Sequence, residues 1–264
     1  MNSPFRILQI LMLMVGFIFL YAPIFILAIM SFNASRLVSV WGGFSTKWYV
    51  ALFRNEQMML SAWISLADAT LSALLSTCLG LLAAVALSRF GAFRSRLIFF
   101  GAIHAPLVLP EVVLGLALLS CFVAMGVGRG FITLVIGHVT FTMCFTTVAL
   151  LAALRECDPV LEEAAMDLGA TPIRAFAFVA LPQITPALAS AFMLAFSLAL
   201  DDLVIASFAT GPGATTLPMR IYSQVRLGVS PQINAMSTLL LGMVALALGT
   251  GALILRPGSR RLPH

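Results

Sequence analysis

Residues 158–186 read DPVLEEAAMDLGATPIRAFAFVALPQITP, a polar segment that lies between two long apolar runs. Asp158-Pro159 predicts a helix start, because Asp caps helices and Pro suits the first helical position. Gly169 predicts the end of that helix, since glycine accepts the left-handed conformation of a C-cap. Thr171-Pro172 repeats the start signal, and Leu181-Pro182 is expected to break the second helix. The segment therefore predicts a helix, a tight turn and another helix.

The first of these short helices is expected to have a charged start and one apolar face. Glu162 and Glu163 fall near its positive end, where carboxylates are favoured. Helical spacing places four apolar residues on one stripe, namely Leu161, Ala164, Ala165 and Leu168.

The rest of the chain is too apolar for a water-soluble domain. Of 264 residues, 61% are hydrophobic and 9% are charged, and the mean hydropathy is +1.06. Soluble domains carry about 25% charged residues. Long apolar runs, rather than alternating segments of about ten residues, argue against an outer-membrane barrel. Because lipid cannot hydrogen-bond the backbone, the composition predicts an all-α membrane protein.

A membrane-spanning helix needs about 20 apolar residues. The chain has six such runs, which predict six transmembrane helices in a single domain over residues 1–264, at about 7–31, 61–88, 97–125, 132–154, 187–208 and 232–255. The first run is longer than the core of a signal peptide, which has about 7–15 residues, so we expect a retained anchor. Cleavage near residues 32–34 is the alternative.

Arginine and lysine predict the orientation of the spans by the positive-inside rule. If the N-terminus is inside, nine of these residues fall in inner segments and six in outer segments. The short loop with Arg89, Arg94 and Arg96 gives the clearest indication, and Arg256, Arg260 and Arg261 add to it. Both termini and the loop 155–186 are therefore expected in the cytoplasm. The net charge of +5 lies at helix ends and does not indicate a nucleic-acid partner.

Four carboxylates fall inside the predicted spans, namely Asp68, Glu111, Asp201 and Asp202. A charge at the centre of a membrane helix costs about 2.5–3.5 kcal/mol on insertion scales, so such residues usually face a cavity or a solute path. At 1.5 Å per residue, Glu111 and Asp201 lie roughly 21 Å from the inner end of their helices. No Lys or Arg is expected at that depth. The set therefore predicts a path for a cationic solute, or else a hydrogen-bonded group that only shapes the helices.

Other candidate site residues give weaker signals. His104 and His138 have no metal-ligand partner at helical spacing, and the four cysteines have no metal or cluster spacing, so we expect packing residues and no metal site. Pro106 and Pro110 interrupt the third span, which indicates either a solute-binding break or a simple kink.

Small residues recur every fourth position in the second span and predict close helix packing, within the chain or between subunits, or a face on the solute path: Ser72, Ser76, Gly80, Ala84 and Ser88.

Enzyme motifs are missing from the sequence. It has no Walker P-loop, no His-Glu-x-x-His and no Gly-x-Ser-x-Gly, so the chain is expected neither to hydrolyse ATP nor to be an enzyme. A membrane-embedded hydrolase that uses Asp201, Asp202 and a histidine stays as an alternative. A passive channel is another, although a channel would not need the polar loop.

The order of residues in the polar loop resembles the coupling loop of permease subunits in ATP-driven, binding-protein-dependent importers. Glu163-Ala164-Ala165 is followed after three residues by Gly169, and after nine more by an aliphatic residue, any residue and Leu181-Pro182. The resemblance implies the six-helix type I importer permease fold. It also implies that Glu163, Ala164, Ala165, Gly169, Leu181 and Pro182 couple to a partner ATPase. An ordinary cytoplasmic hairpin is the alternative.

Three further blocks, residues 106–111, 197–218 and 228–235, resemble polyamine importer permeases, especially those for putrescine. The resemblance implies a multi-pass protein of the bacterial inner membrane, surrounded by lipid, that forms half of a translocation pathway. It also implies the partners: a second, non-identical permease, two ATP-binding subunits that hold ATP and Mg, and a periplasmic polyamine-binding protein. This chain itself would hold no cofactor. Spermidine, or another small solute, is the alternative cargo.

Overall fold

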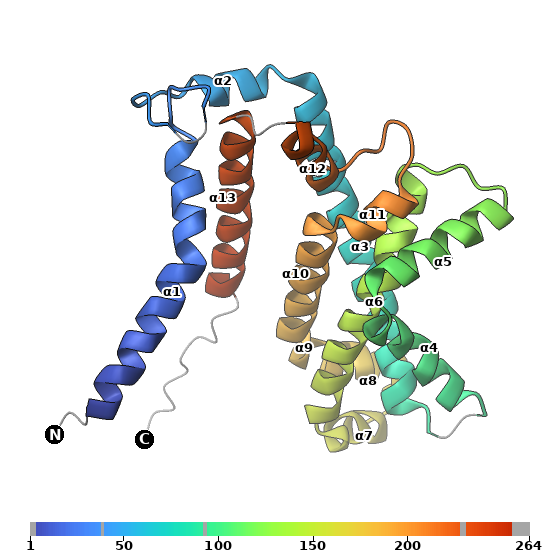
Figure 1. The fold of residues 1–264 in the computed structure, drawn as a ribbon. Coiled ribbons are helices and arrows are strands. Elements are labelled where there is room, and N and C mark those ends of the chain that lie inside the picture. Colours follow the sequence, from blue (N-terminus) through green and yellow to red (C-terminus); the bar gives the residue numbers. More distant parts are fainter. Residues whose placement is uncertain (1–3, 38–39, 92–93, 228–230, 255–264) are drawn as a thin grey trace. The chain divides into compact units, whose positions relative to one another are not determined.

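The computed structural model describes residues 4–37, 40–91, 94–227 and 231–254, and helices make up most of this part of the chain (Figure 1). The all-α prediction is confirmed. The predictions that involved Arg256, Arg260 and Arg261, and part of the block 228–235, fall outside the described residues.

Thirteen α-helices and one π-helix follow each other along the described chain. They are α1 (Pro4–Met30), α2 (Lys47–Phe53), α3 (Glu56–Arg89), α4 (Arg96–Val108), α5 (Glu111–Ala124), α6 (Phe131–Glu156), α7 (Pro159–Asp167), α8 (Pro172–Ala175), the π-helix η1 (Phe176–Ala180), α9 (Leu181–Gln183), α10 (Thr185–Asp201), α11 (Val204–Ala209), α12 (Leu217–Leu227) and α13 (Pro231–Ile254).

The chain forms two compact units. The first combines residues 1–59 with 221–247, and the second combines residues 60–220 with 248–264. The polar loop and the four predicted carboxylates all belong to the second unit.

In the first unit, Asn33 organises the loop between α1 and α2. Its side-chain amide donates to the carbonyl of Val40 at 2.7 Å, and its carbonyl oxygen accepts from the amide of Gly42 at 2.7 Å. The Trp48 indole donates to the carbonyl of Asn33 at 2.7 Å, and the Tyr49 hydroxyl lies 2.6 Å from the Ser31 hydroxyl. Trp48 and Tyr49 of α2 thus hold the end of α1 and the loop after it through specific hydrogen bonds.

Three helices are each long and apolar enough to cross a membrane within the described residues, namely Leu8–Met30, Glu56–Arg89 and Phe131–Glu156. Two bent pairs of helices bring the number to five, if each pair is one span. The sixth predicted span falls on α13, of which Pro231–Leu246 is a shorter apolar helix. The first, second and fourth predicted spans are therefore continuous helices. One bent pair is α4 with α5, in the third predicted span, and the other joins residues 172–183 to α10, just before the fifth.

The third predicted span, 97–125, is interrupted, as its prolines predicted, and the interruption is a break and not a simple kink. Its two halves, α4 and α5, are bent by 117°, which is far more than a proline kink (Figure 1). The chain is extended at Leu109 and Pro110, with ψ values of 137° and 135°. Because a residue before proline avoids the helical conformation, Pro110 accounts for the break, whereas Pro106 stays inside α4.

The fifth predicted span, 187–208, is wrong as a continuous helix. α10 ends at Asp201, Asp202 is extended with ψ 131°, and the chain resumes as α11 at Val204. No glycine or proline lies at this break, and side-chain contacts of Asp202 accompany it. The Asp202 carboxylate accepts from the backbone amide of Ala206 at 2.8 Å, in the manner of a helix cap.

The small-residue pattern of the second span packs α3 against α6 of the same chain. A Cβ on Gly80 would lie 2.2 Å from the Thr146 hydroxyl oxygen, so only glycine allows this approach. The Ser76 and Thr142 hydroxyls lie 2.6 Å apart, and the Thr146 hydroxyl donates to the carbonyl of Ser76 at 2.8 Å. Of the three roles considered for this pattern, packing within the chain is the one that these contacts support.

Candidate functional site

The polar loop begins with the predicted capped helix, α7. The Asp158 carboxylate accepts from the amide of Val160 at 3.0 Å, and Pro159 occupies the first turn. At the other end Gly169 has φ +91°, a conformation that glycine adopts without strain. Its amide donates to Met166, and the amide of Ala170 donates to Ala165. These two bonds form the Schellman motif that ends a helix, so both predicted ends of α7 are confirmed.

The second half of the loop differs from the prediction at Leu181-Pro182. Thr171 caps α8 as expected, through a 3.4 Å bond from the amide of Arg174, but Leu181 and Pro182 do not break the helix that follows. The chain passes through η1 into α9, and the bend of 71° comes afterwards, at Ile184. The wider π turn, with the Leu181 amide bonded to Phe176, makes room for the Pro182 ring beside the preceding turn.

The loop presents an exposed surface that combines acidic and apolar side chains. Glu163 and Ala164 are exposed, and Leu168 and Ile173 are 91% and 81% exposed. On the other side of α7, Glu162 forms an ion pair with Arg89 at the end of α3. The ion pair attaches α7 to the end of a membrane-length helix. The exposed side of the loop stays open to a partner.

A buried polar cluster, which we call the His138 cluster, joins α3, α6 and the break after α10. It consists of Asp68, His138 and Asp202. The His138 Nδ1 atom lies 2.6 Å from an Asp68 carboxylate oxygen, and its Nε2 atom lies 3.2 Å from an Asp202 oxygen. Asp68 and His138 are fully buried and Asp202 is 8% exposed. The Ser72 hydroxyl donates to the other Asp68 oxygen at 3.2 Å.

The geometry of the His138 cluster constrains its protons. An ionised carboxylate only accepts hydrogen bonds, so both ring nitrogens can be satisfied only if the three groups share two protons. With a charged imidazole the cluster carries one net negative charge instead of two. The side chain that joins these two carboxylates is therefore a histidine, which the sequence interpretation had assigned to packing.

The four carboxylates do not form one group. Asp68 and Asp202 meet at His138, whereas Glu111 begins α5 and Asp201 ends α10, and both are exposed. In the described part of the chain, no basic side chain forms an ion pair with Glu111 or Asp201. The four predicted carboxylates thus form two pairs with different surroundings. The signal for His138 in the sequence was its place as one of two histidines inside the predicted spans of a chain whose spans also contain acidic residues.

His104 has the packing role that was expected. Its ring stacks on Phe100 with centroids 3.9 Å apart, and its Nδ1 atom lies 2.8 Å from the Phe100 carbonyl oxygen. Among the described residues there is no group of three or more His, Cys, Asp or Glu side chains that could hold a metal ion.

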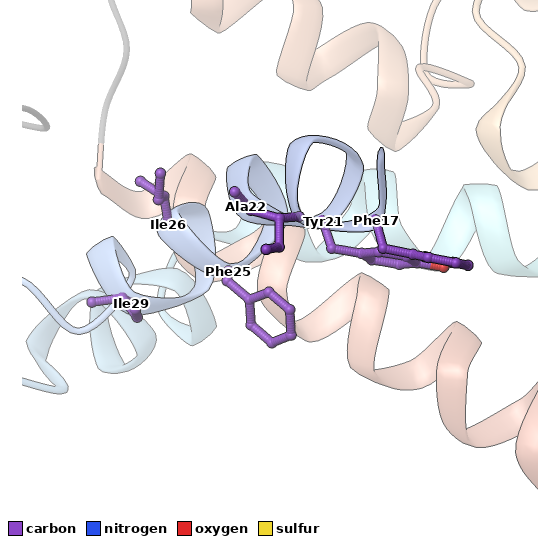
Figure 2. Close-up of a pocket in the computed structure, with 7 residues that line it drawn as sticks. Phe17, Tyr21, Ala22, Phe25, Ile26 and Ile29 are labelled. Atoms are coloured by element: carbon purple, nitrogen blue, oxygen red, sulfur yellow. The ribbon is translucent and has the colours of Figure 1, made fainter. Parts of the chain in front are cut away.

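The first unit has a hollow of a different kind on α1. It has a volume of about 670 Å³ and is lined by one helix face, along which Phe17, Tyr21, Phe25 and Ile29 project (Figure 2). The Phe17 and Tyr21 rings stack with centroids 6.0 Å apart. These side chains offer no charge to a solute. They suit contact with lipid tails or with another apolar helix.

Comparison with known families identifies the class of protein. The family model described as "binding-protein-dependent transport system inner membrane component" matches residues 76–256. The chain belongs to this family. It is therefore a membrane-embedded transport permease, and the family match includes the polar loop, α6 and both sides of the break at Asp202.

Two curated relatives are similar over nearly the whole permease. The putrescine transport system permease protein PotI of Escherichia coli K12 is 51% identical over 93% of this chain and 88% of its own length. The spermidine/putrescine transport system permease protein PotC of the same strain is 40% identical over 90% of each chain.

Solved structures show the same fold at low sequence identity. A chain of a bacterial ABC transporter that imports the acidic polysaccharide alginate superposes with a TM-score of 0.75, at 17% identity, over 96% of this permease and 95% of that chain. A chain of the MetNI methionine ABC transporter in an inward-facing conformation superposes with a TM-score of 0.65, at 21% identity, over 81% and 98%. The predicted importer permease fold is confirmed.

Proposed function

We propose that the permease is a subunit of an ATP-driven polyamine importer and that its cargo is putrescine. The observation that carries the proposal is the 51% identity, over 93% of the chain, to a permease named for putrescine transport. The chain acts as one transmembrane domain, residues 1–264, and forms half of a translocation pathway with a second, non-identical permease.

The four carboxylates support a cationic cargo, and we assign them two different roles. Asp201 and Glu111 are accessible, so they are the groups that can contact a protonated amine directly. Asp68 and Asp202 are already hydrogen-bonded to His138, so we assign them a structural role, which is to stabilise the non-helical conformation after α10. The net negative charge that remains in the His138 cluster also favours a cation nearby.

The coupling loop, residues 155–186, supplies the contact with the ATPase. The exposed surface around Glu163, Ala164, Ala165 and Gly169 docks on an ATP-binding subunit, while Leu181 and Pro182 lie in the support behind it. The ion pair between Arg89 and Glu162 transmits the movement of α7 to the end of α3. Two such ATP-binding subunits, which hold ATP and Mg, and a periplasmic polyamine-binding protein complete the importer.

The orientation follows from this arrangement. If the loop 155–186 meets the ATPase, it faces the cytoplasm, and the N- and C-termini lie on the same side. The excess of arginine at this end of the predicted spans supports the same orientation.

Spermidine is the second candidate cargo, favoured by the 40% identity to a spermidine/putrescine permease. Uptake of labelled putrescine by vesicles that contain the complete importer, with ATP added, tests the proposal. We expect ATP-dependent entry of putrescine that excess spermidine inhibits only weakly. Preferential uptake of spermidine would show that spermidine, and not putrescine, is the cargo. An importer that still hydrolyses ATP but takes up no polyamine would exclude polyamines as its cargo.

A further inference from the structure

Three arginines surround a hollow at one end of the second unit. The hollow has a volume of about 440 Å³ and combines the end of α3, the start of α4 and the end of α6; its lining residues are Leu87, Arg94, Arg96, Leu97, Phe100 and Arg155. We call it the arginine hollow. Arg94 lies in the short loop before α4 and Arg96 is the first residue of α4. The sequence interpretation used both only to orient the spans.

The charge of the arginine hollow is not neutralised by the chain itself. Arg96 donates to the backbone carbonyls of Leu87 at 2.8 Å and Gly91 at 3.0 Å, so it is held in place by uncharged groups. Within the described ranges no carboxylate forms an ion pair with any of the three arginines, and Glu162 is paired with Arg89. Three neighbouring arginines without an ion-pair partner favour an anionic ligand.

The apolar part of the wall indicates what kind of anion fits. Leu97 is 84% exposed and Phe100 is 42% exposed, and Ile98, the residue after Leu97, is 74% exposed. A free phosphate ion would leave these side chains uncovered, whereas an acyl chain would cover them. The site therefore suits an amphiphile with an anionic head.

The position of the arginine hollow along α6 is consistent with a lipid headgroup as the ligand. α6 has 26 residues and ends at Glu156, directly after Arg155. At 1.5 Å per residue it is about 39 Å long, close to the thickness of a bilayer with its headgroup layers. The end of α6 thus lies among lipid headgroups. Basic pockets between membrane helices at this level are known to suit anionic lipids.

We propose that the arginine hollow binds the phosphate headgroup of one anionic phospholipid, with an acyl chain along Leu97 and Phe100. Arg94 and Arg155 contact the phosphate, and Arg96 positions the basic loop. The inference concerns lipid binding and does not depend on which solute the permease carries.

The test compares two double variants with the same charge change in the purified importer complex. Arg94→Gln with Arg155→Gln removes two charges from the hollow, and Arg36→Gln with Arg54→Gln removes two exposed charges from the first unit. Native mass spectrometry measures how much dioleoylphosphatidylglycerol and dioleoylphosphatidylcholine each complex retains from mixed micelles. We expect the first variant to bind phosphatidylglycerol about 25-fold more weakly, about fivefold for each arginine, and the second to bind it like the wild type.

Four results would overturn the proposal. They are equal loss in both variants, equal retention of phosphatidylcholine by the wild type, displacement of the lipid by millimolar inorganic phosphate, and lipid binding only after the ATP-binding subunits are removed. The third would identify a site for a free anion, and the fourth would identify a contact with the ATPase.

A second measurement uses the wild-type complex, in case the first variant does not assemble. A photoreactive phosphatidylglycerol is expected to label the peptides that contain Leu97 or Arg155. Labelling that is confined to other helices would contradict the proposal without any substitution.

Discussion

The Nδ1 atom of His138 lies 2.6 Å from a carboxylate oxygen of Asp68, and both side chains are fully buried. This contact joins α3 to α6, and the second ring nitrogen of His138 extends it to Asp202. The residue at the break between α10 and α11 is therefore in contact with a side chain 64 positions earlier in the chain, in addition to its local bond from the amide of Ala206.

The first prediction concerns His138→Leu. The substitution keeps the apolar volume but leaves two buried carboxylates without a cation. Loss of one partner from a buried ion pair costs about 3–5 kcal/mol, so we expect a large fall in assembled complex and in its unfolding temperature. Yield after purification and thermal unfolding of the complex are the measurements.

Two further variants test the cause. His104→Leu removes a histidine that bonds only to the backbone of its own helix, and it should change stability little. Adding Asp68→Asn to His138→Leu should restore part of the lost stability, because one buried charge is removed. If the Asp68 change made the protein still less stable, charge would not be the reason for the loss.

The second prediction separates two neighbouring carboxylates. Asp201→Asn should reduce transport and leave assembly intact, because Asp201 is exposed and has no ion-pair partner in the described residues. A hydrogen bond to a charged group contributes about 1.5–3 kcal/mol, so the substrate concentration at half-maximal uptake should rise about tenfold or more. Asp202→Asn should instead lower assembly, because it weakens the His138 cluster. Identical effects of the two changes on uptake and on assembly would contradict this division.

Local signals in the sequence predicted the polar loop well. Asp158-Pro159, Gly169 and Thr171-Pro172 each act within a few residues, and each has the predicted role. The helix break predicted at Leu181-Pro182 is wrong, because the π-helix before it accommodates the proline ring and the bend comes later, at Ile184.

The candidate solute site could be predicted only in part. The four acidic residues were predicted because placing a charge inside a membrane helix costs free energy. Their division into a buried and an exposed pair, however, depends on contacts between distant segments. His138 lies 70 residues from Asp68 and 64 from Asp202, so helical spacing carries no sign of their meeting. An unneutralised acid inside a predicted span is a reason to examine every intramembrane histidine as its partner.

The third prediction concerns the contact between α3 and α6. Gly80→Ala would place a methyl group 2.2 Å from the Thr146 hydroxyl oxygen, so the helices must separate. Overpacking of this kind costs about 1–3 kcal/mol, which thermal unfolding of the complex should detect. Gly101→Ala is the matched control in α4, where nothing lies within 4 Å of the new Cβ atom, and it should be neutral or slightly stabilising. Equal losses would mean that close packing at Gly80 is not required.

The fourth prediction concerns the exposed apolar surface of the polar loop. Leu168→Asp changes a side chain that is 91% exposed, so the permease should fold and insert normally. If the ATPase covers this side chain, a charge there should weaken its association about tenfold or more, as at other interface hot spots. Pull-down of the ATP-binding subunit by the permease pair measures the effect. Leu37→Asp, at a residue that is 64% exposed in the loop after α1, should leave the association unchanged.

The last prediction concerns the turn that ends α7. Gly169→Pro is incompatible with φ +91°, and it removes the amide that donates to Met166. The membrane helices do not depend on these two features, so we expect an assembled complex that still hydrolyses ATP. The displaced α7 should no longer follow the ATPase, and uptake per ATP hydrolysed should fall by about tenfold or more, since a 1.4 kcal/mol loss of coupling already gives that factor. Gly43→Pro provides the control, because Gly43 has a similar φ of +99° in the loop between α1 and α2. Coupled uptake that survives Gly169→Pro, or that falls equally in both variants, would show that the geometry of this turn does not connect the permease to its energy source.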